Sequence, residues 1–294
     1  MQAIQTKGNP VCVGLDPVAD RLPAALKPTS KDPAHIARLF GTFCKAIIDV
    51  VAPLVPVVKP QAAFFEMYGA AGWQVLAEVV SHARQNGLIV VMDAKRGDIG
   101  NTATAYAQAF LDQATTSGLC SDALTINPYL GDDSMQPFLD VAAANGNGLF
   151  VLVKTSNPGG KLFQDLTAEG KMVYQHVAEY VETESLASAG KSGYGLVGAV
   201  VGATYPEQLV ELRQSMPHAI LLVPGFGAQG GKADDVAGAF DAQGLGAIVN
   251  SSRNIIFAHA RTEFAAVTGW QRAVDLATRE MINQLAEGIK PDSL

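Results

Sequence analysis

The sequence has no long hydrophobic run, and its longest apolar stretches fall far short of a membrane span. Residues 50–58, for example, are apolar but include two prolines, whereas a spanning helix needs roughly 18 apolar residues. Residues 1–8 lack the apolar stretch of a signal peptide. We therefore expect no membrane association and a cytoplasmic location.

Positive charge, cysteine and histidine are also scarce. The 21 basic residues are outnumbered by 28 acidic ones, for a net charge of −7, which argues against non-specific binding to nucleic acid or an anionic membrane. The five histidines show no His-x-x-x-His spacing, so we expect neither a metal site nor a Ser-His-Asp triad. Cys12, Cys44 and Cys120 are scattered in apolar surroundings, which predicts buried thiols in a reducing compartment.

What the chain does contain is a regular alternation of short apolar runs and longer amphipathic stretches. The apolar runs are continuous and rich in β-branched residues, as is typical of parallel strands buried on both faces. The predicted strands are Val11–Asp16, Val55–Lys59, Leu88–Lys95, Ala123–Asn127, Leu149–Lys154, Leu196–Gly202, Ile220–Pro224 and Ala247–Ser251. The predicted helices cover residues 36–51, 66–85, 102–116, 134–144, 167–186, 206–216, 232–240 and 262–285.

Eight strand–helix units predict an α/β protein of one domain, residues 1–294, folded as a (β/α)₈ TIM barrel. A doubly wound open sheet is the alternative. The eight repeats and the absence of a Gly-x-Gly-x-x-Gly turn after the first strand count against that alternative. Residues 155–165 form a Gly- and Pro-rich segment that is long enough to act as a lid.

Charged residues follow the first three predicted strands, where a barrel enzyme places its active site. The third strand ends in Asp93-Ala94-Lys95-Arg96-Gly97-Asp98. Because side chains alternate along a strand, Asp93 and Lys95 should share a face. Lys59 ends the second strand and Asp16 the first. A lysine held between carboxylates can act as a positioned proton donor.

Each of these residues also has a simpler interpretation. Asp16 could cap the turn before Pro17, Lys59 could be an extended surface lysine, and Asp98 could cap the next helix. Charge at the ends of three successive strands is hard to explain by capping alone. The carboxylates could in principle hold Mg²⁺, but the neighbouring lysines would repel a cation.

Two glycine- and serine-rich loops near the other end of the chain predict a phosphate site. The seventh strand leads into residues 224–231, Pro-Gly-Phe-Gly-Ala-Gln-Gly-Gly, and the eighth into Asn250-Ser251-Ser252-Arg253. Glycines let backbone N–H groups approach an anion, and Arg253 adds a bidentate donor. The loops after strands seven and eight are the usual phosphate-binding corner of a TIM barrel.

Together these motifs resemble the orotidine 5′-phosphate decarboxylase family, in particular its longer bacterial subgroup. The resemblance spans nearly the whole chain. It rests on Gly14-Leu15-Asp16, Lys59, Asp93-x-Lys95-x-x-Asp98, the Thr-Ser-Asn-Pro-Gly-Gly segment at 155–160, and the two phosphate loops. Ser252 precedes Arg253 where shorter members commonly carry glycine.

The resemblance implies a cofactor-free decarboxylation of orotidine 5′-phosphate to uridine 5′-phosphate. Lys95 would protonate C6 of the pyrimidine within an array of Lys59, Asp93, Lys95 and Asp98. The enzyme would be a homodimer whose sites borrow residues from the partner subunit. The implied substrate-binding residues are Asp16 and Lys59 at the ribose, Ser156 at the pyrimidine, Pro224, Gln229, Ser252 and Arg253 around the phosphate and lid, and Asp98, Ile99 and Thr102 from the partner.

Two other functions share some of these features. A Mg²⁺-dependent sugar-phosphate decarboxylase or aldolase of the same barrel group would use the same Asp-x-Lys-x-x-Asp motif, and its activity would be lost in excess chelator. A non-catalytic phosphate-binding barrel would keep the phosphate loops, but it would not need Lys59, Asp93, Lys95 and Asp98 together.

Overall fold

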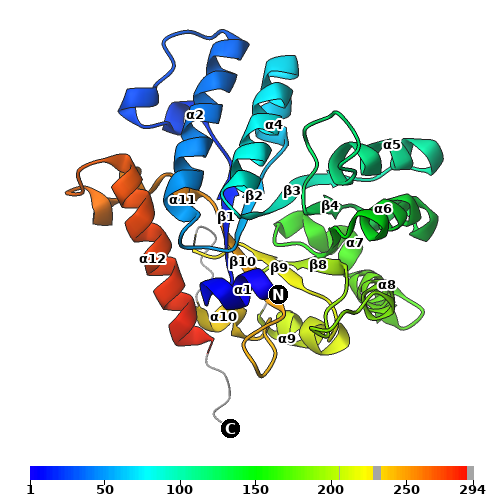
Figure 1. Ribbon diagram of the computed structural model, residues 1–294. Helices are drawn as coiled ribbons and strands as arrows, with labels where there is room; N and C mark the ends of the chain where they lie inside the picture. The colour runs from blue at the N-terminus through cyan, green and yellow to red at the C-terminus, as the bar shows by residue number, and fades with distance from the viewer. Residues whose placement is uncertain (205, 228–232, 290–294) are drawn as a thin grey trace.

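Eight parallel strands close into a barrel in the computed structural model, which describes residues 1–204, 206–227 and 233–289 (Figure 1). The predicted (β/α)₈ barrel is thus confirmed, with strand bounds within two residues of those expected. The order around the barrel is β1, β2, β3, β4, β5, β8, β9, β10 and back to β1. The strands are β1 Val11–Leu15, β2 Val57–Pro60, β3 Ile89–Arg96, β4 Ala123–Ile126, β5 Gly148–Lys154, β8 Val197–Val201, β9 Leu221–Pro224 and β10 Ala247–Ser251.

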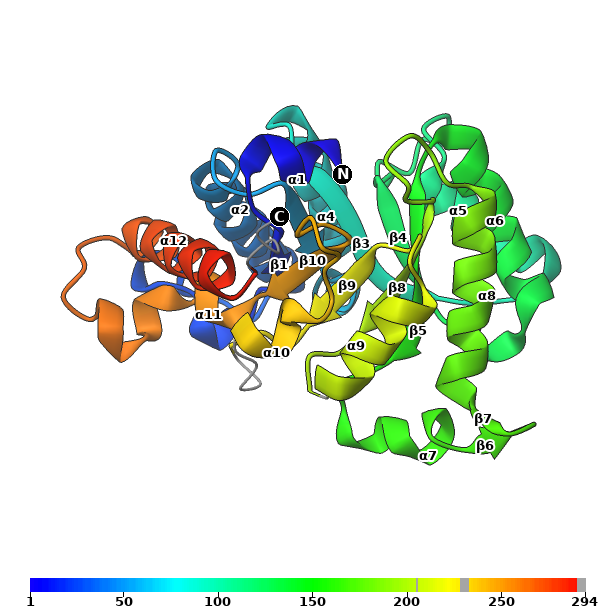
Figure 2. The same ribbon diagram turned by 90° about the horizontal axis from the view of Figure 1, so that it is seen from below.

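Helices surround the barrel, and α1 covers one of its ends. Figure 2 shows α1 at one end, and α7 with the small β6–β7 hairpin at the other. The α-helices are α1 Gln2–Lys7, α2 Pro33–Val51, α3 Ala63–Glu66, α4 Gly69–Gln85, α5 Gly100–Leu111, α6 Asp132–Asn145, α7 Lys161–Gln164, α8 Val173–Ala187, α9 Pro206–Ser215, α10 Ala233–Ala237, α11 Arg253–Ile256 and α12 Trp270–Gly288. Short 3₁₀ turns cover Ala19–Arg21, Ala24–Leu26, Pro128–Leu130, Pro158–Gly160, Ala258–Ala260 and Thr262–Phe264.

The barrel interior changes from apolar to polar along the strands. One buried residue from each strand forms an apolar cluster with Ile4 of α1, namely Cys12, Val57, Val91, Ala123, Phe150, Val200, Leu222 and Ile248. Because side chains on one face of a strand recur every second residue, the next interior positions are Gly14, Lys59, Asp93, Thr125, Leu152, Gly202, Pro224 and Asn250. Four of these eight are polar or charged, and they lie towards the carboxyl ends of the strands.

The outer core lies between strands and helices and follows the predicted amphipathic faces. In α2, residues Phe40, Phe43, Ile47 and Val51 share one face at helical spacing and are fully buried, and Ile36 at the start of the same face is partly buried. The helix begins at Pro33, three residues before the predicted start, because the Asp32 side chain caps it by accepting a hydrogen bond from the His35 amide at 2.9 Å.

Two predicted helices begin later than expected, because the chain first adopts left-handed backbone. Residues 167–172 form a hairpin of β6 Thr167–Ala168 and β7 Lys171–Met172, turning at Glu169 (φ +51°) and Gly170 (φ +83°). Such angles cannot continue a right-handed helix. Likewise α12 begins only after Gly269, at φ +88°. The segment 155–165 is not an open loop, since it contains a 3₁₀ turn and α7.

The three cysteines are free thiols that differ in burial. Cys12 and Cys44 are buried, and burial raises the pKa of the Cys12 thiol to about 12. Cys120 is only partly buried, contrary to expectation, because it lies in the connection before β4. No helix in the described part of the chain is long and apolar enough to span a membrane.

Candidate active site

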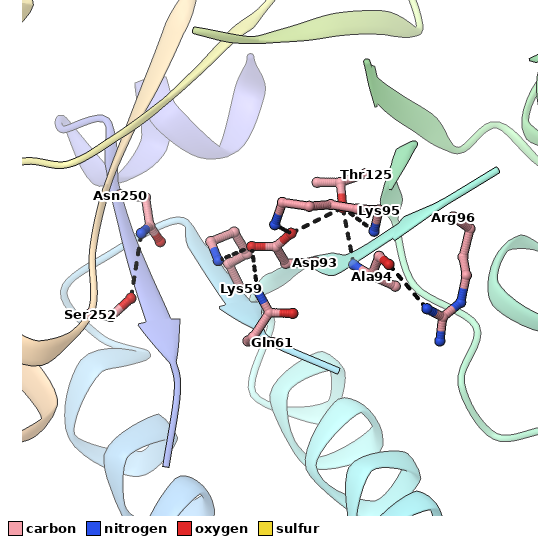
Figure 3. A network of polar contacts seen from close by, with 9 residues as sticks. All are labelled: Lys59, Gln61, Asp93, Ala94, Lys95, Arg96, Thr125, Asn250 and Ser252. Carbon is pink, nitrogen blue, oxygen red and sulfur yellow. Dashed lines mark hydrogen bonds and ion pairs between the residues drawn. The ribbon is translucent and has the colours of Figure 1, made fainter. Parts of the chain in front are cut away.

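The Asp93 carboxylate is the centre of the polar interior. It lies on β3, is 7% exposed, and is held between two lysines. Lys59 Nζ donates to Asp93 Oδ2 at 2.6 Å, and Lys95 Nζ donates to Oδ1 at 2.5 Å. Gln61 Nε2 and Thr125 Oγ1 also donate to the carboxylate, both at 3.1 Å (Figure 3). Four donors from three strand ends therefore converge on one carboxylate.

This arrangement keeps Asp93 and Lys59 charged despite their burial. Burial alone would raise the pKa of Asp93, but the ammonium groups of Lys59 and Lys95 outweigh it and hold that pKa well below its ordinary value of 3.8. Burial would likewise lower the pKa of Lys59, yet the carboxylates of Asp93 and Asp16 raise it above its ordinary value. The site is a fixed alternation of charges at neutral pH.

The two lysines differ in their access to solvent. The Lys59 side chain is 6% exposed, whereas the Lys95 side chain is 45% exposed. Lys95 also has left-handed backbone, φ +48°, where the pairing of β3 with β4 shifts register between Met92 and Arg96. The expected contact of Asp93 with Lys95 is present, but it is made at this bulge and not by regular alternation. Lys95 is thus the more exposed lysine of the pair, although only Lys59 of the two is among the residues that line the pocket described below.

The next residue, Arg96, fixes the outer side of the bulge. Its guanidinium forms an ion pair with Glu66 and donates to the Ala94 carbonyl at 3.1 Å. It also lies over the rings of Tyr106 and Phe110 of α5. The carboxyl end of β3 is therefore held from outside as well as from within the barrel.

A pocket of about 190 Å³ runs from the charged cluster to the loops after β9 and β10. The Oδ1 atoms of Asp16 and Asn250 are buried there and have no hydrogen-bond partner among the described residues, so each is an acceptor for a ligand. Arg253, the first residue of α11, is exposed at the far end of the pocket. The lining residues are Asp16, Lys59, Gln61, Asp93, Pro224, Gly225, Phe226, Asn250, Ser251, Ser252 and Arg253.

The structure thus brings together most of the expected site residues within one chain, but not all of them. Ser156 lies just after β5, beside Gly202 of the neighbouring strand end, and is not among the lining residues. Ile99 and Thr102 are exposed at the start of α5. Asp98 accepts a hydrogen bond from the Ile99 amide at 2.8 Å, but Ile99 is the N-cap residue of α5 and no side chain caps that helix, so the capping interpretation of Asp98 is wrong. Gln229 lies outside the described residues.

Three polar residues of the site were not assigned a role from sequence. Gln61 and Thr125 both hydrogen-bond Asp93, and Asn250 contributes an unpaired acceptor. The sequence contained a signal for each of them. Gln61 lies two residues after Lys59, Thr125 two after Ala123 and Asn250 two after Ile248, and these earlier residues all occupy interior strand positions. A polar residue at period two near a strand end is the pattern that would have found them. Among the described residues, no group of three or more His, Cys, Asp or Glu could hold a metal ion.

Comparisons with known proteins agree with this geometry. Residues 9–266 match the model of the orotidine 5′-phosphate decarboxylase / HUMPS family. The chain is 57% identical to an orotidine 5′-phosphate decarboxylase of Rhodopirellula baltica, covering 96% of each chain, and 43% identical to one of Deinococcus radiodurans, covering 93% and 91%. The structure of Leishmania donovani OMP decarboxylase superposes with a TM-score of 0.75 at 32% identity, covering 98% of this chain and 97% of that one. The chain belongs to the orotidine 5′-phosphate decarboxylase family.

Proposed function

We propose that this protein catalyses the decarboxylation of orotidine 5′-phosphate to uridine 5′-phosphate, the last step of de novo UMP synthesis. The observation that carries the proposal is the Asp93 carboxylate held between Lys59 and Lys95, at the inner end of a pocket that reaches Arg253. The relatives named above carry the same activity in their names. A decarboxylase of this kind needs a charged group at the reacting carbon and a second one at the phosphate. Asp93 and Lys59 at one end of the pocket and Arg253 at the other supply both.

In the reaction, the bond between C6 and the carboxylate carbon breaks and its electron pair stays on C6. Carbon dioxide leaves, and C6 takes a proton from the Lys95 ammonium, whose neutral amine then regains a proton from water. No ring position delocalises the carbanion, so its stabilisation is electrostatic. An ammonium about 4 Å from it contributes about 4 kcal/mol at an effective dielectric of about 20.

That contribution is a part of the roughly 8–23 kcal/mol by which enzymes lower barriers. The rest comes from interactions that order the site around the bound substrate. The unpaired Oδ1 atom of Asp16 accepts from a ribose hydroxyl, Ser156 contacts the pyrimidine, and Arg253 with Ser252 and Gln229 holds the phosphate. Closure of the segment 155–165 over the substrate excludes water.

The experiment that tests this function is an assay of the purified protein in excess chelator with orotidine 5′-phosphate. We expect the ultraviolet absorbance of the substrate to fall as uridine 5′-phosphate forms. No reaction, with or without added Mg²⁺, would contradict the proposal. Activity that depends on added Mg²⁺ would instead favour the metal-dependent barrel enzymes.

The proposal includes a homodimer in which Asp98, Ile99 and Thr102 complete the partner's site. In support, Ile99 is 59% exposed although it is apolar, and further exposed apolar side chains follow β4 and β5 at the same end of the barrel. These side chains are Tyr129, Leu130, Leu162, Phe163 and Leu166. A surface of this kind is typical of a subunit interface. The expected cytoplasmic location is part of the same proposal.

A further inference from the structure

Among the described residues, the hydroxyl of Thr125 is the one side-chain group that hydrogen-bonds both the backbone and the Asp93 carboxylate at the end of β3. Thr125 lies on β4, is 1% exposed, and faces the barrel interior. Its Oγ1 accepts hydrogen bonds from the Ala94 amide at 3.0 Å and the Lys95 amide at 2.9 Å. The same oxygen donates to Asp93 Oδ1 at 3.1 Å. Figure 3 shows Thr125 beside Lys95, with all three contacts.

These contacts use the full hydrogen-bonding capacity of a hydroxyl, which has one proton and two lone pairs. Since two backbone amides occupy the lone pairs, the proton has to point at the carboxylate. The orientation of the Asp93 carboxylate is therefore tied to the backbone of the two residues that follow it.

The need for such a hydroxyl arises from the bulge. Where the pairing of β3 with β4 shifts register, successive amides of β3 lose their regular partners on β4. The Thr125 hydroxyl replaces those partners and holds Lys95 in its left-handed backbone conformation, φ +48°. That conformation returns the Lys95 ammonium to Asp93 Oδ1 at 2.5 Å.

We infer that Thr125 is a positioning residue for the decarboxylation, acting through the backbone of Lys95 and the carboxylate of Asp93. This inference rests on the proposed function. Without the hydroxyl, substrate binding through Arg253 and the phosphate loops would persist, but the Lys95 ammonium would no longer be held where C6 needs its proton. Displacement of a catalytic group by about 1 Å costs about 100-fold in rate.

The test compares Thr125→Val, which keeps the shape and removes the hydroxyl, with Thr125→Ser, which keeps the hydroxyl. We expect Thr125→Val to lower kcat about 100-fold with KM changed less than about threefold, and Thr125→Ser to stay within about threefold of wild type. Thr278→Val is the matched control, because Thr278 is fully buried in α12 and donates only to the Val274 carbonyl at 2.7 Å.

Rates are expressed per site that binds uridine 5′-phosphate, so that partial unfolding does not imitate a loss of kcat. A purely structural role would lower the melting temperature and the number of binding sites while kcat per site stayed unchanged, and that result would overturn the inference. If Thr125→Val does not fold, Thr125→Cys replaces it, and wild-type kcat in that variant is equally contrary. A wild-type protein without decarboxylase activity would instead refute the proposed function.

Discussion

At the scale of single residues, the chemistry depends on a carboxylate that stays ionised between two ammonium groups. Asp93 is buried, and an isolated carboxylate there would take up a proton. Lys59 and Lys95 prevent this through their ion pairs with the carboxylate, and the charge of the buried Lys59 is in turn stabilised by Asp93. The contacts of the free enzyme therefore favour the ionised forms of the two buried groups, Asp93 and Lys59.

Replacing Asp93 by Asn should expose the energetic cost of this arrangement. The variant leaves Lys59 buried without its 2.6 Å partner, and removing one member of a buried pair costs about 3–5 kcal/mol of unfolding free energy. The folded pKa of Asp93 lies below its ordinary value of 3.8. Its stabilising contribution is therefore complete above that value and is lost as the pH falls through and below it.

The free energy of unfolding, measured with denaturant, should thus fall on acidification more steeply in the wild type than in Asp93→Asn. The difference between the two proteins should shrink by about 1 kcal/mol between about pH 6 and about pH 3. Asp20→Asn, at an exposed carboxylate, serves as the control. A difference that does not change over this range would mean that the pKa of Asp93 is not lowered by folding.

At the scale of elements, the ends of β1 and β10 lie close together because Gly14 has no side chain. A Cβ atom on Gly14 of β1 would lie 1.9 Å from Ser252 Oγ and 2.8 Å from Ser252 Cβ. The absence of a side chain at Gly14 therefore lets the β10 end, with Ser252 and Arg253, close over the barrel. This glycine links the first strand to the proposed phosphate site.

We expect Gly14→Ala to push Ser252 and Arg253 outward and to raise KM for orotidine 5′-phosphate about tenfold, which corresponds to about 1.4 kcal/mol. Adding Ser252→Gly removes the atoms that clash and should restore KM. Gly190→Ala is the control, since a Cβ atom there meets nothing within 4 Å. KM is measured by steady-state kinetics. An unchanged KM in Gly14→Ala would show that Ser252 and Arg253 can shift without weakening substrate binding.

At this scale, the strands could be predicted from the sequence, whereas irregular backbone could not. Buried parallel strands have a strong hydrophobic signature, so all eight strands and the charged residues at their ends could be predicted. The bulge at Lys95 could not, because it depends on the register between β3 and β4 and on the Thr125 hydroxyl. The hairpin at residues 167–172 was missed for a similar reason, since Glu169 in left-handed backbone has no sequence signal.

At the scale of the whole molecule, one chain holds an incomplete version of the proposed site. Among the described contacts, Asp98 accepts a hydrogen bond only from its neighbour Ile99. The apolar side chains of Ile99, Tyr129, Leu130, Leu162, Phe163 and Leu166 are exposed at the same end of the barrel. Asp98 was identified from its spacing to Lys95, but its place in a partner's site comes from the family resemblance. The single-domain prediction and the dimer both stay predictions.

Mixing two inactive variants tests the shared site. Lys95→Ala and Asp98→Ala each remove one member of the array, and in a mixed dimer both defects fall in one site while the other site is intact. After subunit exchange at equal amounts, about half the dimers are mixed, so activity should recover to about a quarter of wild type. Two inactive proteins that stay inactive after verified exchange would contradict a site shared through Asp98.

The most direct test of the central claim, that Lys95 supplies the proton to C6, is the turnover of orotidine 5′-phosphate by Lys95→Ala, measured together with binding of uridine 5′-phosphate by calorimetry. Since Lys95 is the more exposed lysine and Lys59 remains to hold Asp93, we expect the variant to fold and to bind uridine 5′-phosphate within about tenfold of wild type. Its turnover should fall by at least about 1,000-fold. Turnover near that of the wild type would contradict the account.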